Sequence, residues 1–166
     1  MPDNFDEKFL KAVEVILDHE GGYVDDPDDR GGETKFGISK QSYPHLDIPA
    51  LDLDAAKAIY FEDYWQPERY HEIQDLTLII KLFDLAVNMG TRMAHRLIQR
   101  ALRSAGRDVI EDGLLGPKTI AAINAVDVSD LLAALKSEAA GYYRSIAASN
   151  PKQRKFLKGW LNRAYS

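Results

Sequence analysis

A glutamate and a run of aspartates near the start of the chain are the residues best suited to chemistry. Glu20 follows an apolar-patterned segment, and Asp25, Asp26, Asp28 and Asp29 come soon after it. Two carboxyl groups flanking a cleft can hydrolyse a glycosidic bond, because one protonates the leaving oxygen while the other activates water or stabilises the oxocarbenium-like centre. The alternative for each aspartate is a turn-forming role, since Asp side chains often satisfy turn backbones.

Glu20 falls at or just past the end of a helix predicted over residues 4–19, where apolar residues recur at helical spacing. Gly21 and Gly22 then end the helix through a left-handed position. The partial negative charge at a helix C-terminus disfavours an ionised carboxylate, and desolvation by neighbours would add to this effect. Glu20 is therefore the candidate general acid. The plainer alternative is a solvated glutamate at a helix end.

The segment that carries the aspartates reads as a small hairpin or three-stranded patch. Asp26-Pro27 and Gly31-Gly32 are turn signals, and residues 34–38 could form one short strand. The aspartate spacing does not match a calcium-binding EF-hand loop, and the histidines share no ligand spacing, so no metal and no cofactor are expected. The chain has no cysteine, which excludes a thiol nucleophile and a disulfide framework.

The rest of the chain predicts a mainly α fold. Residues 75–89 leave almost no polar face, which is typical of a buried helix at the centre of a domain. The other predicted helices cover residues 53–65, 91–105, a segment starting at Pro117, a longer one starting at Asp127 or Ser129, and 152–164. No linker rich in Pro, Gly or Ser separates the later helices, so we expect them to pack onto the first part as one unit.

Bulk composition limits the classes of partner. The chain has 166 residues and a net charge of −5 without a basic block, which argues against a nucleic-acid partner. The first residues lack the order of a signal peptide, so we expect synthesis in the cytoplasm. The most apolar run, residues 76–87, is too short to span a bilayer, so no stable membrane insertion is expected. A holin or another export system would have to carry the protein to a target outside.

Several strings together resemble one enzyme family. Glu20, Asp29 and Thr34 followed by Gly37-Ile38 are similar to the phage lysozyme pattern, in which a helix-terminal Glu precedes an Asp and a Thr on a hairpin. The string over residues 20–39 more closely resembles glycoside hydrolase family 108, the N-acetylmuramidases and secretion-activator proteins of bacteria and phages. The string Asp-Leu-Ala-Val-Asn-Met-Gly at 84–90 fits this family. Asp-Gly-Leu-Leu-Gly-Pro-Lys-Thr at 112–119 resembles the motif of its C-terminal peptidoglycan-binding half.

The resemblance implies a lysozyme-like helical domain with a small N-terminal β-hairpin. Residues 1–90 would be the catalytic part, and residues 91–166 would be the peptidoglycan-binding segment. The implied activity is cleavage of the β-1,4 bond between N-acetylmuramic acid and N-acetylglucosamine in peptidoglycan. Glu20 carries over as the acid and Asp29, with Thr34, as the group that handles water. Asp25, Asp26 and Asp28 are rivals of Asp29, and inversion is expected if the two carboxyls lie well apart.

Other side chains are candidates for holding the glycan. Aromatic rings stack on sugars, which suggests Tyr23, Tyr64 and Trp65, with core packing as the alternative. Asn88, at the end of the buried helix, could bond an N-acetyl group or cap the helix. Gln99 is polar among apolar neighbours, so it could face the groove or the solvent.

Three other functions stay open from the sequence. Related helical enzymes include lytic transglycosylases, which use a single Glu and no water. A non-catalytic glycan-binding or secretion-accessory protein would need no acid at all. A chitosanase-type enzyme acting on other glycans is compatible with the negative net charge, since its substrate is cationic.

Overall fold

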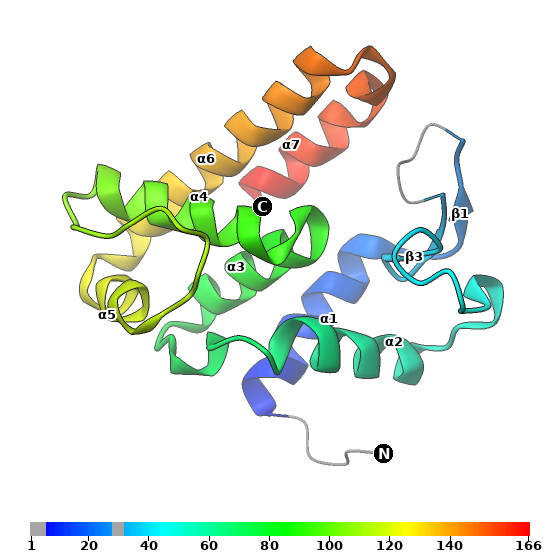
Figure 1. Ribbon diagram of the computed structural model, residues 1–166, viewed down its shortest axis with the longest axis horizontal. Coiled ribbons are helices and arrows are strands. Elements are labelled where there is room, and N and C mark those ends of the chain that lie inside the picture. The colour runs from blue at the N-terminus through cyan, green and yellow to red at the C-terminus, as the bar shows by residue number, and fades with distance from the viewer. Residues whose placement is uncertain (1–5, 28–31) are drawn as a thin grey trace.

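Helices dominate the structure, a computed structural model that describes residues 6–27 and 32–166. Within those ranges the α-helices and strands in chain order are α1 (Glu7–Glu20), β1 (Val24–Asp25), β2 (Glu33–Lys35), β3 (Ile38–Ser39), α2 (Leu53–Tyr60), α3 (Leu76–Met89), α4 (Thr91–Ser104), α5 (Pro117–Ala125), α6 (Val128–Ser149) and α7 (Leu157–Tyr165). The hairpin and α2 lie on one side of the molecule and α4 to α6 on the other (Figure 1). The mainly α fold with one small sheet confirms the prediction.

Helix α1 delivers Glu20 to a fixed place. Its N-cap is Asp6, whose carboxylate accepts a hydrogen bond from the Lys8 backbone N–H at 2.9 Å. Its apolar face is fully buried, and Glu20 is the last residue of the helix, followed by Gly21 at φ +60°. The position predicted for Glu20, at the helix end, is therefore confirmed.

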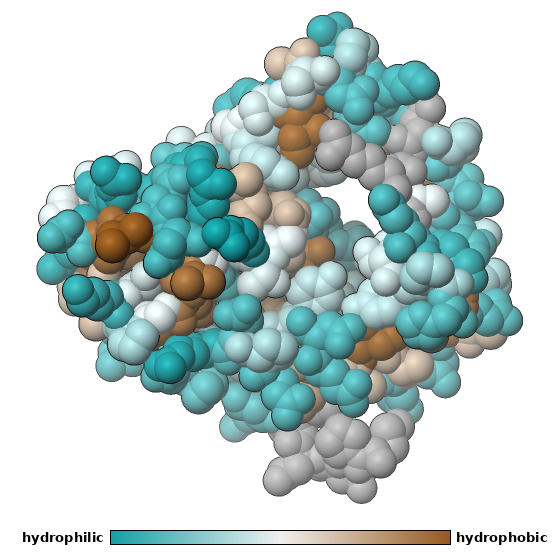
Figure 2. All heavy atoms as spheres, in the orientation of Figure 1, coloured by the Kyte–Doolittle hydropathy of each residue, from teal (hydrophilic) through white to brown (hydrophobic). Residues whose placement is uncertain are grey.

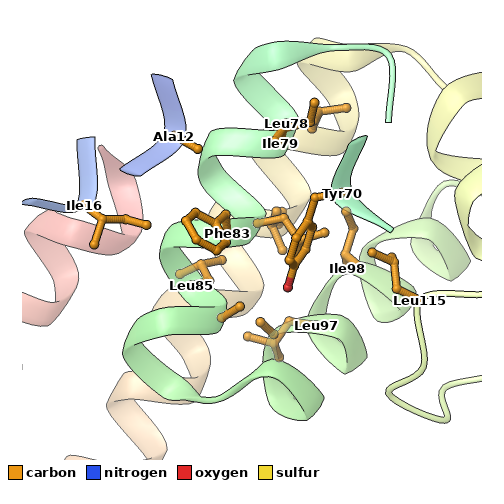
Figure 3. Packing of buried hydrophobic residues seen from close by; sticks show 14 of the residues in the cluster. Ala12, Ile16, Tyr70, Leu78, Ile79, Phe83, Leu85, Leu97, Ile98 and Leu115 are labelled. Atoms are coloured by element: carbon orange, nitrogen blue, oxygen red, sulfur yellow. The ribbon is translucent and has the colours of Figure 1, made fainter. Parts of the chain in front are cut away.

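Helix α3 is the buried centre of the fold, as its apolar pattern predicted. It contacts α1, α4 and α6, and Figure 3 shows its Phe83 and Leu85 among side chains from the elements around it. The Phe83 ring meets the rings of Phe9, Trp65 and Tyr70 at centroid distances of 6.1, 5.3 and 5.6 Å, all at steep angles. Edge-to-face pairs of this kind add to the free energy gained by burying the rings.

The three strands form an antiparallel sheet in the order β1-β2-β3. Thr34 in the central strand pairs with Val24 on one side and Ser39 on the other. The expectation of one strand over residues 34–38 is wrong, because Phe36 and Gly37 have φ of +53° and +80° and reverse the chain. Two consecutive positive φ values are the mark of a tight two-residue hairpin turn.

The C-terminal helices pack on α3 and on each other. Helix α4 contacts both α3 and α6, and α6 lies along α7. A 3₁₀ turn over Pro151–Phe156 joins α6 to α7. On the other side of the molecule, α2 runs into a π-helical turn over Phe61–Trp65, so the predicted helix over 53–65 is continuous but changes its winding. In the portion that the structure describes, none of the helices has the length and apolarity needed to cross a membrane.

Candidate active site

A cleft of about 370 Å³ lies between the hairpin and the α6–α7 pair. Glu20 lines it from the end of α1, Thr34 and Ser39 line it from the sheet, and Asn88 lines it from the end of α3. The space-filling view is hollowed between the hairpin side and the C-terminal helices (Figure 2). Residues of the first and the last helix therefore share one cavity.

Glu20 is held by an arginine from the far end of the chain. The Arg163 guanidinium, in the last turn of α7, places Nη1 2.5 Å from Oε1 of Glu20. The same guanidinium donates from Nε and Nη2 to the two oxygens of Asp84 at 3.1 and 2.8 Å. Such paired hydrogen bonds fix the arginine geometrically. One cation is thus shared between a carboxylate that lines the cleft and one beneath it.

Asp84 is an almost fully buried charge that organises this group. Its side chain is only 2% exposed, and besides Arg163 it contacts Nδ1 of His19 at 3.1 Å. Burial disfavours the charged form of Arg163, but the hydrogen bonds and charge of Asp84, followed by those of Glu20, outweigh it and raise the arginine pKa. Lys81, whose pKa burial lowers to about 8, donates to the Arg163 backbone carbonyl at 2.7 Å. The end of α7 is therefore held to α3 by both the side chain and the backbone carbonyl of Arg163.

The hairpin turn lies close against the side chain of Glu20. A Cβ built on Gly37 would lie 2.8 Å from Cγ and 2.9 Å from Cδ of Glu20 and would overlap the Tyr60 hydroxyl. That hydroxyl donates to the carbonyl of Phe36, and burial raises the Tyr60 pKa, so the phenol stays protonated. Gly37 is needed here for its positive φ and for the close approach of its backbone to the carboxyl group.

Three of the predicted site residues line the cleft with Glu20, namely Thr34, Tyr64 and Asn88. Asn88 accepts a hydrogen bond from the Tyr143 hydroxyl. Asp29 and its rival Asp28 lie outside the described residues.

The other two aspartate rivals have been placed by the structure. Asp25 is exposed in β1, opposite Glu33 of β2. Asp26 forms a salt bridge of 2.9 Å with Lys155, which ties the hairpin to the 151–156 turn. In the portion of the chain that the structure describes, Glu20 is the one acidic residue among those that line the cleft.

Two predicted aromatic residues lie outside the cleft lining. Tyr23 is 46% exposed on the hairpin, where its hydroxyl donates a hydrogen bond to Glu33 at 2.6 Å. This hydrogen bond raises the pKa of Tyr23 to about 12. Trp65 is 3% exposed and packs against Phe9, Tyr70 and Phe83, so the prediction that it stacks on a sugar is wrong. Its ring belongs to the core, whereas the neighbouring Tyr64 lines the cleft.

Gln99 is neither in the groove nor in solvent. It is fully buried, and its Nε2 lies within 3.0 Å of both Asp112 Oδ1 and the Leu114 carbonyl and 3.2 Å from Thr119 Oγ1. Its Oε1 accepts from the Gly113 N–H at 2.9 Å. The amide thus braces the 112–119 loop from inside. Asp112 braces its own turn, as predicted, by accepting from the Leu114 N–H at 2.9 Å.

Sequence reasoning missed the contribution of the C-terminal half to this cleft. Tyr142, Tyr143, Gln153, Phe156 and Trp160 all line it. A local signal existed for the ion pair, because Lys81 and Asp84 interrupt an otherwise apolar helix and buried charges must be paired. Within the described ranges no cluster of His, Asp and Glu has the arrangement of a metal site.

Comparison with known proteins agrees with this architecture. The family model described as Glycosyl hydrolase 108 matches residues 13–90, and the model described as Predicted Peptidoglycan domain matches residues 93–165. The two models together span residues 13–165, and this pairing of a glycosyl hydrolase 108 part with a peptidoglycan part is the one that the motifs predicted.

One of the solved structures similar to the chain is that of SagA from Brucella abortus. It matches with a TM-score of 0.78 and 26% sequence identity, over 95% of this chain and 89% of that chain. No curated protein shows a significant match. The fold is therefore mainly α and lysozyme-like, and the class of protein is a glycoside hydrolase with a peptidoglycan domain.

Proposed function

We propose that this protein is an N-acetylmuramidase that hydrolyses the β-1,4 bond between N-acetylmuramic acid and N-acetylglucosamine of peptidoglycan. The observation that carries the proposal is the placement of Glu20. It is the terminal residue of α1, it lines the 370 Å³ cleft together with Thr34, and its carboxyl group is fixed between Gly37 and Arg163. A carboxyl group held in one orientation beside a substrate cleft is suited to proton transfer.

Glu20 would protonate the glycosidic oxygen as the bond to the leaving sugar breaks. Asp84 takes two hydrogen bonds of the guanidinium and Glu20 takes one contact, so protonation of Glu20 leaves Arg163 still neutralised by its buried partner. A bound glycan would also exclude water from the cleft around Glu20.

Asp29 is proposed as the second carboxylate and Thr34 as its partner in positioning the attacking water. Thr34 supports this role because it stands in the central strand and lines the same cleft as Glu20. Tyr64 and Asn88 would contact the glycan from the same cleft. Residues 1–90 and 91–166 would act as one catalytic unit on the wall, which the protein would reach through a holin or another export route.

The decisive experiment compares wild type with Glu20→Gln on purified peptidoglycan. Loss of the general acid should lower the rate by at least about a hundredfold while leaving the fold and glycan binding intact. Asp29→Asn and Asp25→Asn, made in parallel, should separate the working aspartate from a turn-forming one. Lysis by Glu20→Gln at the wild-type rate would show that the assignment of Glu20 is wrong.

A lytic transglycosylase is the second candidate, and one observation favours it. Glu20 is the one acidic residue found in the cleft lining among the described residues, and a transglycosylase needs a single Glu. The released muropeptides discriminate between the two reactions. Reducing muramic acid ends support hydrolysis, whereas 1,6-anhydro ends would replace it with transglycosylation.

A further inference from the structure

The wall of the cleft contributed by the C-terminal half is aromatic. Trp160 stacks on Tyr143 at a centroid distance of 5.5 Å and an interplanar angle of 23°, and it lies 5.8 Å from Phe156 at 33°. All three rings line the cavity that Glu20 lines. They come from α7, α6 and the 151–156 turn. We name these three residues the aromatic strip.

The strip is fixed to the catalytic half of the molecule. Tyr143 is 2% exposed, and its hydroxyl donates to the side-chain carbonyl of Asn88 at the end of α3. Burial raises the Tyr143 pKa, which keeps this donor protonated. The rings thus keep their position relative to Glu20 through α3, whose Asp84 holds the Arg163 partner of Glu20.

Trp160 is the member of the strip that is open to a ligand. It is partly exposed, and no hydrogen bond of its indole is found in residues 6–27 and 32–166. Every buried side-chain nitrogen and oxygen in those ranges has a partner, so the indole N–H reaches solvent. A flat apolar face with a free donor at its edge matches a pyranose ring, which has apolar C–H faces and hydroxyl groups around its rim.

The polar side chains of the peptidoglycan motif are engaged within their own loop. Thr119 Oγ1 and Oδ1 of the exposed Asp112 both accept hydrogen bonds from the buried amide of Gln99. Gln153, by contrast, is a buried polar side chain that lines the cleft beside the aromatic strip. The second half therefore presents polar and aromatic groups to a glycan at the catalytic cleft.

We propose that Trp160, supported by Tyr143 and Phe156, is a sugar-binding subsite that stacks one β-1,4-linked N-acetylhexosamine ring of the glycan strand. This inference rests on the proposed function and names the part of the cleft that holds the substrate. The peptidoglycan domain then contributes to catalysis by binding the glycan strand next to Glu20.

The test measures affinity in the Glu20→Gln background, in which cleavage should be at least about a hundredfold slower. A short β-1,4-linked N-acetylglucosamine oligomer and purified glycan strands are titrated by calorimetry. Trp160→Ala should raise Kd by about tenfold and Trp160→Phe by less than about threefold, because phenylalanine keeps a stacking face. Tyr165→Ala is the matched control, since Tyr165 is a 51% exposed aromatic residue of the same helix and does not line the cleft. Unchanged affinity in Trp160→Ala would overturn the subsite.

Fluorescence gives a second measurement that does not depend on the stability of the alanine variant. The chain has two tryptophans, and Trp65 is 3% exposed, so saturating glycan should change the emission of Trp160. The change should disappear in Trp160→Phe, and its absence from the parent protein would overturn the proposal.

The two proposals fail in different ways. Glycan binding through Trp160 without any bond cleavage by wild type would remove the enzymatic function and leave the subsite. Cleavage with an unchanged KM in Trp160→Ala would remove the subsite and leave the enzyme.

Discussion

The close approach of the hairpin turn to Glu20 makes Gly37 a position where even a methyl group should be harmful. Substitution by alanine forces a side chain onto a residue with φ of +80°, which costs about 1–2 kcal/mol because L-residues disfavour this region. The new Cβ would also lie 2.8 Å from Glu20 Cγ and overlap the Tyr60 hydroxyl. Overpacking of this kind costs about 1–3 kcal/mol more.

Gly32 is the matched control, since its φ is +71° and a Cβ there would meet nothing within 4 Å. Gly32→Ala should therefore cost only the backbone strain of about 1–2 kcal/mol, whereas Gly37→Ala should cost about 2–5 kcal/mol. For a chain of this length each kcal/mol lowers Tm by about 2–4 °C. Gly37→Ala should also lower kcat, because the carboxyl group of Glu20 must move to make room.

Thermal unfolding and initial rates on purified peptidoglycan measure both effects. Adding Tyr60→Phe to Gly37→Ala should recover part of the lost stability, since it removes the hydroxyl that the new Cβ overlaps. If Gly37→Ala and Gly32→Ala prove equal in Tm and in kcat, the turn does not position Glu20 and the reasoning is refuted.

Two further perturbations test buried ionisable groups, first Arg163 with Asp84 and then His95. Arg163→Met should lower the free energy of unfolding by about 3–5 kcal/mol, because it leaves Asp84 buried without its cation. Adding Asp84→Asn should recover much of the loss, whereas the exposed Arg144→Met should stay within about 0.5 kcal/mol of wild type in urea titrations. Burial lowers the pKa of His95 to about 4 from an ordinary 6.5. As the pH falls, the unfolded chain therefore takes up a proton at this residue before the folded chain does. Proton uptake at His95 therefore leaves the free energy of unfolding unchanged above pH 6.5 and lowers it by about 3 kcal/mol as the pH drops toward 4. His95→Gln should flatten that part of the pH profile, and an unchanged profile would contradict the assignment.

Local patterns predicted the parts of the fold that depend on neighbours in sequence. The end of α1 at Glu20 follows from helical periodicity and two glycines, and the burial of α3 follows from its lack of a polar face. The turn at Phe36-Gly37 was missed because β-forming residues on both sides resemble one continuous strand.

The remaining parts of the site depend on contacts between distant segments. Arg163 reaches Glu20 from the other end of the chain, and no spacing rule links the two. Gln99 was misread because its partners stand on a loop whose fold the sequence does not show. Trp65 and Tyr64 are neighbours in the π-helical turn, and no local pattern shows that the first faces the core and the second the cleft.

The ion pair between Glu20 and Arg163 also sets an order of events during synthesis. Helix α1 leaves the ribosome well before α7, and at about 5–20 residues per second the delay is on the order of ten seconds. During that time Glu20 has neither its guanidinium partner nor the aromatic wall of the cleft. A nascent or prematurely stopped chain that lacks α7 therefore has Glu20 without its ion pair and a cleft without its last wall. If the proposed function is right, activity would arise only after α1 and α7 have packed together.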